Sequence, residues 1–416
     1  MNDAFGLIQK YTGISRYSDS EVMTPQNIVK DMVDMLPKDV FGPNSKFIDP
    51  AVKSGRFLVE LYNRLMDSDA MKMAFPNEHD RHEHILHNQL YGIAMSETAA
   101  IIVRKQLYDD FTILGNIIYT DDKLTQELVQ GVFNNMKFDV VIGNPPYNND
   151  KYLDFVILGC KLAYNSVCMI TPAKWASKGG DKNSKFRKYI VPLMSKVVFF
   201  PDTGDVFNVR LQGGVSYFLI DKEEHKSADV KTVCSRVKQF ESGIESISIG
   251  ERKCLLYNNK IAAIVKKVGC FEPNFKPLKH YAEQYKEYFV LSALNASDAS
   301  GSKSFHMFSS DGTILMTTPS CVGKLADCGY NAAMFSSDNI AECESFDSYI
   351  NTKFVRFMIL MRYCRNSVDN NESWSFVPDP GAFDHIFTDN ELYKTYGLTP
   401  DEINIIESVI KERKLS

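Results

Sequence analysis

The stretch FDVVIGNPPYNND, Phe138–Asp150, decides the fold of this 416-residue chain. Its apolar run Val140–Ile142 predicts a short buried β-strand that ends at Gly143. The two prolines that follow form a rigid turn without backbone donors, and they bias Asn144 towards an extended conformation. The chain therefore presents an amide side chain and the aromatic ring of Tyr147 directly at the end of a buried strand.

Six further apolar segments predict strands, and helical patterns separate most of them. Strands that alternate with helices favour parallel pairing in a sheet that is covered on both faces. Asp49, Asp121 and Asn144 fall at the carboxyl ends of such strands, where α/β sheets bind their ligands. The sequence thus predicts an α/β fold with a site at that edge. The six segments are residues 46–50, 90–94, 117–119, 166–172, 196–203 and 214–222.

The charge of the chain is mixed. Its net value of −5 does not by itself indicate a nucleic-acid binder. Two stretches, residues 174–196 and 252–279, are nevertheless rich in lysine and arginine. They favour contact with a polyanion on one face, and a solvated surface is the alternative.

Other sequence features exclude several classes of protein. Nine cysteines without a CxxC pair favour reduced thiols in a cytoplasmic protein and argue against a zinc site. The first residues show no signal-peptide pattern, and no apolar run approaches the ~20 residues of a membrane span. The histidines between His79 and His87 lack the HExxH spacing, so we interpret them as a solvated helix face and expect no metal site.

The alternation of strands and helices ends where the sequence turns polar, in the segment DKEEHKSADVK at residues 221–231. Shorter β-like segments follow, and Thr399–Glu402 has the capping-box pattern that starts a closing helix. We therefore divide the chain into a first domain, residues 1–225, and a second, mixed α+β domain, residues 226–416.

An Asn-Pro-Pro-Tyr turn at a strand end suits chemistry on an exocyclic amine. The Asn144 amide oxygen and the Pro145 carbonyl oxygen can accept the two N–H groups of such an amine and free its lone pair from the ring. Tyr147 offers a flat face for a base, a contact of about 1–3 kcal/mol. Attack on an electrophilic methyl group then requires positioning and electrostatics rather than a metal or a thiol.

These residues resemble the catalytic NPPY motif of the N6-adenine-specific DNA methyltransferases. The order of the motifs resembles their gamma group, of the restriction–modification methylase type, in which cofactor motifs precede the catalytic motif and target recognition comes last. The segment WSFVPDPGAF, residues 374–383, resembles the C-terminal end of such methylases. The resemblance covers residues 20–222 and the C-terminal end.

The resemblance implies S-adenosyl-L-methionine as the cofactor. MTPQNIVKDMV, residues 23–33, resembles the segment that holds its methionine part, and FIDPAVKSGRFLVEL, residues 47–61, resembles its glycine-rich loop. Lys53 replaces a glycine of that loop. Glu97 would bind the ribose, because Ala94 stands where an acid is usual. Either Asp121 or Asp122 would contact the adenine. The implied cofactor-binding residues are Thr24, Pro25, Asp49, Pro50, Ala51, Lys53, Gly55, Phe57, Glu97, Asp121 and Asp122.

The resemblance also implies the fold and the reaction. The fold would be a class I methyltransferase, with a seven-stranded, mostly parallel sheet and a target-recognition domain after it. The reaction would be methyl transfer to N6 of an adenine flipped out of double-stranded DNA, and a restriction nuclease, where there is one, would be a separate partner. The implied catalytic residues are Asn144, Pro145, Pro146 and Tyr147, and the implied substrate contacts are Tyr147 and Phe207. Lys174, in the basic stretch, is a further candidate substrate contact because its charge suits a DNA phosphate.

Two alternatives stay open. The NPPY motif also serves RNA and protein-glutamine methyltransferases, although the long C-terminal half favours DNA. Lys53 and Ala94 leave open a catalytically inactive DNA-binding protein on a methyltransferase fold. The oligomeric state is open as well.

Overall fold

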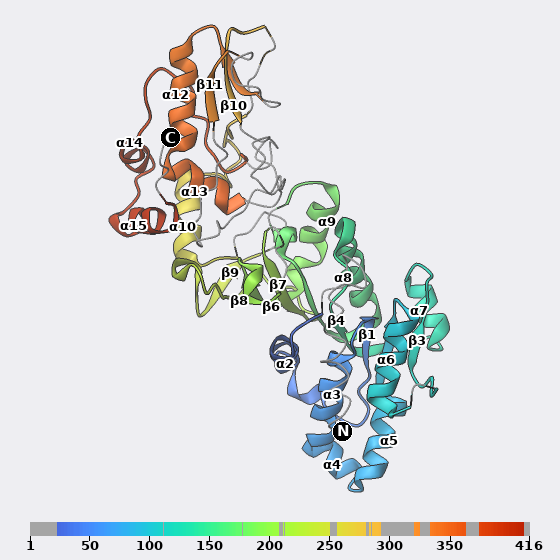
Figure 1. Cartoon of the computed structure of the whole chain (residues 1–416). Helices are drawn as coiled ribbons and strands as arrows, with labels where there is room; N and C mark the ends of the chain where they lie inside the picture. The colour runs from blue at the N-terminus through green and yellow to red at the C-terminus, as the bar shows by residue number, and fades with distance from the viewer. Residues whose placement is uncertain are drawn as a thin grey trace.

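The protein is described by a computed structural model over residues 23–110, 112–176, 178–207, 211, 213–249, 256–279, 283, 285–292, 320–324, 333–362 and 374–411. In these residues the strands form a nine-stranded sheet in the N-terminal part and a three-stranded sheet towards the C-terminus. Figure 1 shows the two sheets apart from each other along the molecule. Across the same residues, no helix has the length and apolar character that crossing a membrane requires.

The large sheet runs in the order β3-β2-β1-β4-β5-β7-β6-β8-β9 within the described part of the chain. Strands β1 to β5 pair in parallel, and β7 lies antiparallel between β5 and β6. Strands β1 to β7 correspond to the seven predicted strands and confirm the α/β fold with a large, mostly parallel sheet. In the described residues, β8 and β9 extend that sheet from the seven predicted strands to nine. The strands are β1 (Phe47–Val52), β2 (Leu90–Ala94), β3 (Ile117–Tyr119), β4 (Phe138–Gly143), β5 (Ala163–Pro172), β6 (Met194–Phe200), β7 (Val215–Ile220), β8 (Ser227–Thr232) and β9 (Ile244–Ser248).

Both faces of the large sheet are covered by helices. On β4, Val140 and Ile142 pack in one apolar cluster with helices α2 to α6, and Val141 packs in the other with α7 to α9. This two-sided burial explains why the strands read as continuous apolar runs. The helices are α2 (Gln26–Asp34), α3 (Arg56–Asp67), α4 (Asp69–Ala74), α5 (Glu78–Asn88), α6 (Glu97–Tyr108), α7 (Gln126–Val132), α8 (Lys151–Leu162) and α9 (Asp181–Tyr189).

The large sheet continues beyond residue 225, where we divide the chain on sequence grounds. β8 pairs in parallel with β6, and β9 pairs antiparallel with β8. The polar segment that suggested a boundary, residues 221–231, comprises the turn after β7 and most of β8. In it, His225 Nε2 lies 2.9 Å from Asp221 Oδ1, and the backbone N–H of His225 donates to the carbonyl of Pro192 at 2.6 Å. The division into domains, with target recognition in residues 226–416, stays a prediction.

The second sheet lies at one end of the molecule, beside α12 (Figure 1). It is antiparallel, and its order is β11-β10-β12. Lys267 on α10 contacts Glu402 on α15 at 2.6 Å, and Thr399 with Glu402 forms the predicted capping box. The elements are α10 (Asn259–Val268), β10 (Tyr288–Ser292), β11 (Ser320–Gly323), β12 (Ala333–Ser337), α12 (Ile340–Asn351), α13 (Lys353–Arg362), α14 (Asp389–Thr395) and α15 (Pro400–Val409).

Candidate active site

Asn144, the first residue of the NPPY turn, is buried at the carboxyl end of β4. Its side-chain Nδ2 donates a hydrogen bond to Thr24 Oγ1 at 3.1 Å, although 120 residues separate the two. Arg56 Nη1 donates to the carbonyl oxygen of Thr24 at 2.8 Å, and Pro25 then caps α2. The fold thus brings together three segments that the sequence singles out: the NPPY turn, the start of α2 and the start of α3.

Asp49 lies beside the end of β4, because β1 and β4 are parallel neighbours. Its side chain is 3% exposed, and its Oδ1 accepts a hydrogen bond from the backbone N–H of Ala51 at 2.9 Å. A Cβ atom at Gly143 would lie 2.5 Å from that oxygen, so only glycine leaves room for the carboxylate. Sequence reasoning treated Gly143 as a strand end and missed this role; its place directly before Asn144 was the available signal.

The carboxyl group of Asp49 has an unusual acidity. Burial raises its pKa from the ordinary value of 3.8 to about 7, and the N–H of Ala51 and the ammonium of Lys53 act in the opposite direction. Near neutral pH this carboxyl therefore gains or loses a proton readily. A cationic ligand group beside it would favour the ionised form.

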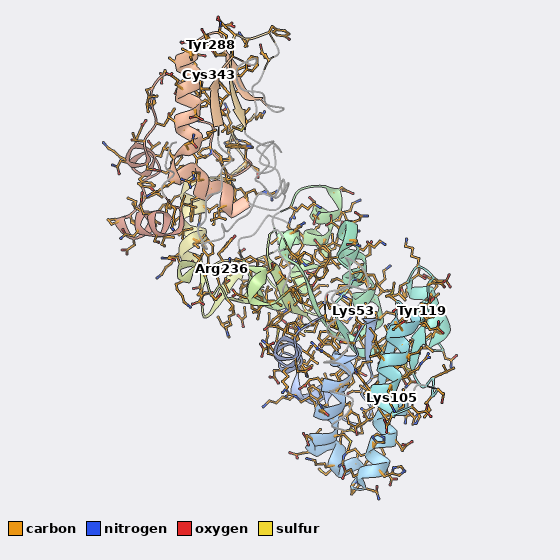
Figure 2. The ribbon with its side chains drawn as sticks, in the orientation of Figure 1. Lys53, Lys105, Tyr119, Arg236, Tyr288 and Cys343 are labelled. Carbon is orange, nitrogen blue, oxygen red and sulfur yellow. The ribbon has the colours of Figure 1, made fainter. Side chains whose placement is uncertain are left out.

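The loop between β1 and α3 turns at Gly55, which has a left-handed φ of 75° and caps α3. A Cβ there would come within 3.0 Å of Val103 Cγ2. Phe57 is buried and anchors the start of α3 in the apolar cluster. Lys53, labelled in Figure 2, is not one of the described non-glycine residues with positive φ. The backbone at that position therefore accepts a lysine without the freedom of glycine.

Acidic side chains follow β2 and β3 at the same edge of the sheet. Glu97 is the exposed first residue of α6, and Asp121 and Asp122 are exposed after β3. Ala94 is fully buried and pairs with Tyr119, which is 40% exposed at the end of β3 (Figure 2). The structure places both aspartates alike and does not distinguish them.

Tyr147 is half-buried, and its hydroxyl donates to the carbonyl oxygen of Ile170 on β5 at 3.4 Å. Burial raises the pKa of Tyr147 above its usual range, so the phenol stays neutral. The edge of its ring meets Tyr152 on α8, with 6.5 Å between ring centroids. Pro145 is buried and Pro146 half-buried. Tyr147 is therefore held from two elements, β5 and α8.

Phe207 and Lys174 are the two other candidate substrate contacts. Phe207 is 3% exposed within the apolar cluster that covers one face of the sheet, and its backbone N–H donates to the carbonyl of Thr203 at 2.7 Å. Lys174 is half-buried in a short 3₁₀ helix, Ala173–Ala176, after β5. A role of either residue in contacting the substrate stays a prediction.

The basic stretch at residues 174–196 is largely paired within the protein. Three of its lysines contact aspartates, and the buried Arg187 donates to two backbone carbonyls at 2.8 Å. This pairing favours a structural role for these cations over a chain of free phosphate contacts. The ion pairs are Lys178–Asp150, Lys182–Asp154 and Lys185–Asp181.

The histidines near α5 make contacts within their own part of the fold. The hydroxyl of Tyr62 lies 2.7 Å from His82 Nδ1, and His84 Nε2 lies 2.8 Å from the carbonyl oxygen of Pro43. In the part of the chain that the structure describes, no group of three or more His, Cys, Asp and Glu residues is placed to hold a metal ion.

Comparison with known proteins finds similarity over the part of the chain that holds this site. Residues 2–195 match the family model of the N-6 DNA methylases. An uncharacterised adenine-specific methylase of Mycoplasma pneumoniae is 25% identical over 50% of this chain and 68% of its own length. The methylase subunit of the type I restriction enzyme MjaVII from Methanocaldococcus jannaschii is 27% identical over 38% of this chain and 24% of its own length.

Among solved structures, the M protein of the type I restriction enzyme EcoKI is similar, with a TM-score of 0.40 and 16% identity over 54% of this chain and 51% of that one. The chain thus spans about a quarter of the MjaVII subunit and about half of the EcoKI protein. The matched residues hold the NPPY turn, the loop after β1 and the strands that bring them together. Over residues 2–195, which hold this site, the chain is similar to the N-6 DNA methylase family.

Proposed function

We propose that this chain transfers the methyl group of S-adenosyl-L-methionine to N6 of an adenine at specific sites in double-stranded DNA. The observation that carries the proposal is the meeting of Asn144 with Thr24 at the end of β4, beside the buried Asp49. The match of residues 2–195 to the N-6 DNA methylase family supports it. The names of two similar proteins, both type I restriction methylase chains, support a restriction–modification context.

The residues present fit the proposed cofactor. Asp49 is a buried carboxyl with a pKa of about 7, which can balance the ammonium of an amino acid moiety. Gly143 and Gly55 keep side chains out of the two turns beside it. The exposed acids Glu97 and Asp121 or Asp122 follow β2 and β3, where carboxylates can accept hydrogen bonds from ribose hydroxyls or an amine. When bound, S-adenosylmethionine supplies an electrophilic methyl group on a sulfonium.

Asn144 would hold the amine that receives the methyl group. Its Nδ2 faces Thr24, so its amide oxygen points the other way and can accept one N–H of an exocyclic amine. The carbonyl of Pro145 would accept the other. Two acceptors on one amine draw its nitrogen out of conjugation with the ring and expose the lone pair. The turn is rigid, so the acceptors are positioned before substrate arrives.

Tyr147 would take the adenine ring. An adenine N6 inside a duplex cannot reach a buried asparagine, so the base must be flipped out of the helix. The hydroxyl of Tyr147 is fixed on β5, and its half-buried ring offers a stacking surface worth about 1–3 kcal/mol. Double-stranded DNA is thus the proposed partner, and the proposed location of the protein is the cytoplasm. A restriction nuclease, where there is one, would be a separate partner.

The test is transfer of a labelled methyl group to DNA, RNA and protein side by side, followed by nucleoside mass spectrometry of the DNA. We expect N6-methyladenine in DNA from wild-type protein and none from Asn144→Ala, which should still bind the cofactor in calorimetry. Label in RNA or on glutamine would replace the DNA proposal by that alternative. No transfer together with no cofactor binding would favour the inactive DNA-binding protein.

A further inference from the structure

The segment after the NPPY motif has a backbone that needs external support. Asn149 and Asp150 are consecutive non-glycine residues with left-handed φ angles of 53° and 56°. Asparagine and aspartate tolerate this conformation better than other side chains, but it remains unfavourable. It lies between Tyr147 and α8, so any relaxation there would shift the turn that carries Asn144.

Lys178 supplies support from a distant segment. Its Nζ pairs with the carboxylate of Asp150, and the two side chains are 16% and 23% exposed. Asp150 occupies the capping position of α8 without a side-chain capping bond, so its carboxylate serves Lys178 instead. Lys182 Nζ adds a hydrogen bond to the backbone carbonyl of Asp150 at 3.0 Å.

Lys178 is itself fixed to the sheet. Arg187 Nη1 donates to the backbone carbonyls of Lys178 and Trp175, each at 2.8 Å. Trp175 is fully buried, and its Nε1 donates to Ser216 Oγ on β7 at 3.2 Å. A continuous set of contacts therefore runs from the core of the sheet to Asp150.

We propose that the Lys178–Asp150 ion pair is a positioning device, which holds the NPPY turn in the geometry that methyl transfer requires. The inference rests on the proposed function. Neither residue touches the substrate; each acts through the backbone of residues 144–150. Loss of the pair lets Asp150 leave the left-handed conformation and shifts Tyr152, whose ring supports Tyr147. Because a misplacement of about 1 Å can slow a reaction ~100-fold, the effect on turnover should be large.

The experiment compares Lys178→Met, Lys178→Arg and Asp150→Asn with wild type. Lys185→Met is the matched control, because its partner Asp181 is on the same helix and both are well exposed. We expect Lys178→Met and Asp150→Asn to lower kcat at least tenfold, with the Kd for S-adenosylmethionine and the KM for DNA within about twofold of wild type. Lys178→Arg should retain most of the wild-type kcat, and the control Lys185→Met should match wild type. The double variant Lys178→Met with Asp150→Asn should have a kcat no lower than that of the slower single variant.

Hydrogen exchange gives a readout that needs no activity. In Lys178→Met we expect faster amide exchange in residues 144–155, and unchanged exchange there in Lys185→Met. Wild-type exchange in that segment, or a kcat within twofold of wild type, would overturn the positioning role. An inactive wild-type protein whose Lys178→Met variant still exchanges faster would instead refute the proposed function and leave the support of the turn standing.

Discussion

Asn144 Nδ2 and Thr24 Oγ1 form a hydrogen bond across 120 residues, between the end of β4 and the residue before α2. Both side chains are nearly fully buried. The bond decides which end of the Asn144 amide faces the protein, and thereby which end can face a substrate. A threonine that could be only a helix start in the sequence is thus tied to the candidate catalytic residue.

Thr24→Val should lower methyl transfer while preserving the fold. Valine has nearly the same shape, so no cavity forms, but the buried N–H of Asn144 loses its acceptor. Such a loss costs about 1–3 kcal/mol, and an amide free to turn would present the wrong end to the amine. We expect at least a tenfold lower kcat and a slightly lower Tm, measured by steady-state kinetics and thermal unfolding. Thr24→Ser keeps the hydroxyl and should keep most of kcat. A kcat of Thr24→Ser as low as that of Thr24→Val would contradict the role of this hydrogen bond.

Gly143→Ala should disrupt the candidate site. The added Cβ would lie 2.5 Å from Asp49 Oδ1 and 3.1 Å from its Cγ, and β4 is buried on both sides. The carboxylate must move away from the turn, so we expect weaker cofactor binding by at least tenfold in calorimetry, together with a lower Tm.

Gly131→Ala is the matched control. Gly131 lies in α7, where an added Cβ meets nothing within 4 Å. Alanine favours a helix over glycine by about 1 kcal/mol, so this variant should be as stable as wild type or more so. Equal behaviour of the two variants would show that the contact with Asp49 is not the cause.

Much of this fold could be predicted from the sequence, because strands that are buried on both faces consist of unbroken apolar residues. β8 is an exception, because its residues alternate between buried and exposed positions. Its exposed residues are polar, so the sequence predicted a linker there instead of a strand. The contact between Asn144 and Thr24 cannot be read at all, because only the folded sheet brings the two together. Lys178 reads as a phosphate contact until the position of Asp150 is known.

Phe207→Ala separates two roles for a buried aromatic ring. The side chain is 3% exposed within the apolar cluster, so we expect a loss of stability of about 3–5 kcal/mol in denaturant unfolding. Phe207→Leu keeps much of the volume and should retain most of the stability and activity. If Phe207 clamps the flipped base instead, Phe207→Ala would keep its stability and lose DNA affinity, as seen in equilibrium binding.

Asp49 should make both stability and cofactor binding depend on pH. Its pKa is about 7 in the folded protein and near 3.8 in the unfolded chain, so the folded state binds a proton more tightly. The resulting stabilisation is present in full below pH 3.8 and is lost as the pH rises through about 7, a difference of up to about 4 kcal/mol. Asp49→Asn removes the charge, so without cofactor it should be more stable than wild type at pH 8, and this difference in stability should shrink towards pH 5.

Cofactor binding should show the opposite trend, because the ionised carboxylate attracts an ammonium. The affinity of wild type for the cofactor should fall below pH 7, and that of Asp49→Asn should be low at every pH. Denaturant unfolding and calorimetry at pH 5, 6.5 and 8 measure both, and a wild-type protein with the same pH dependence as Asp49→Asn would show that this carboxyl does not titrate in this range.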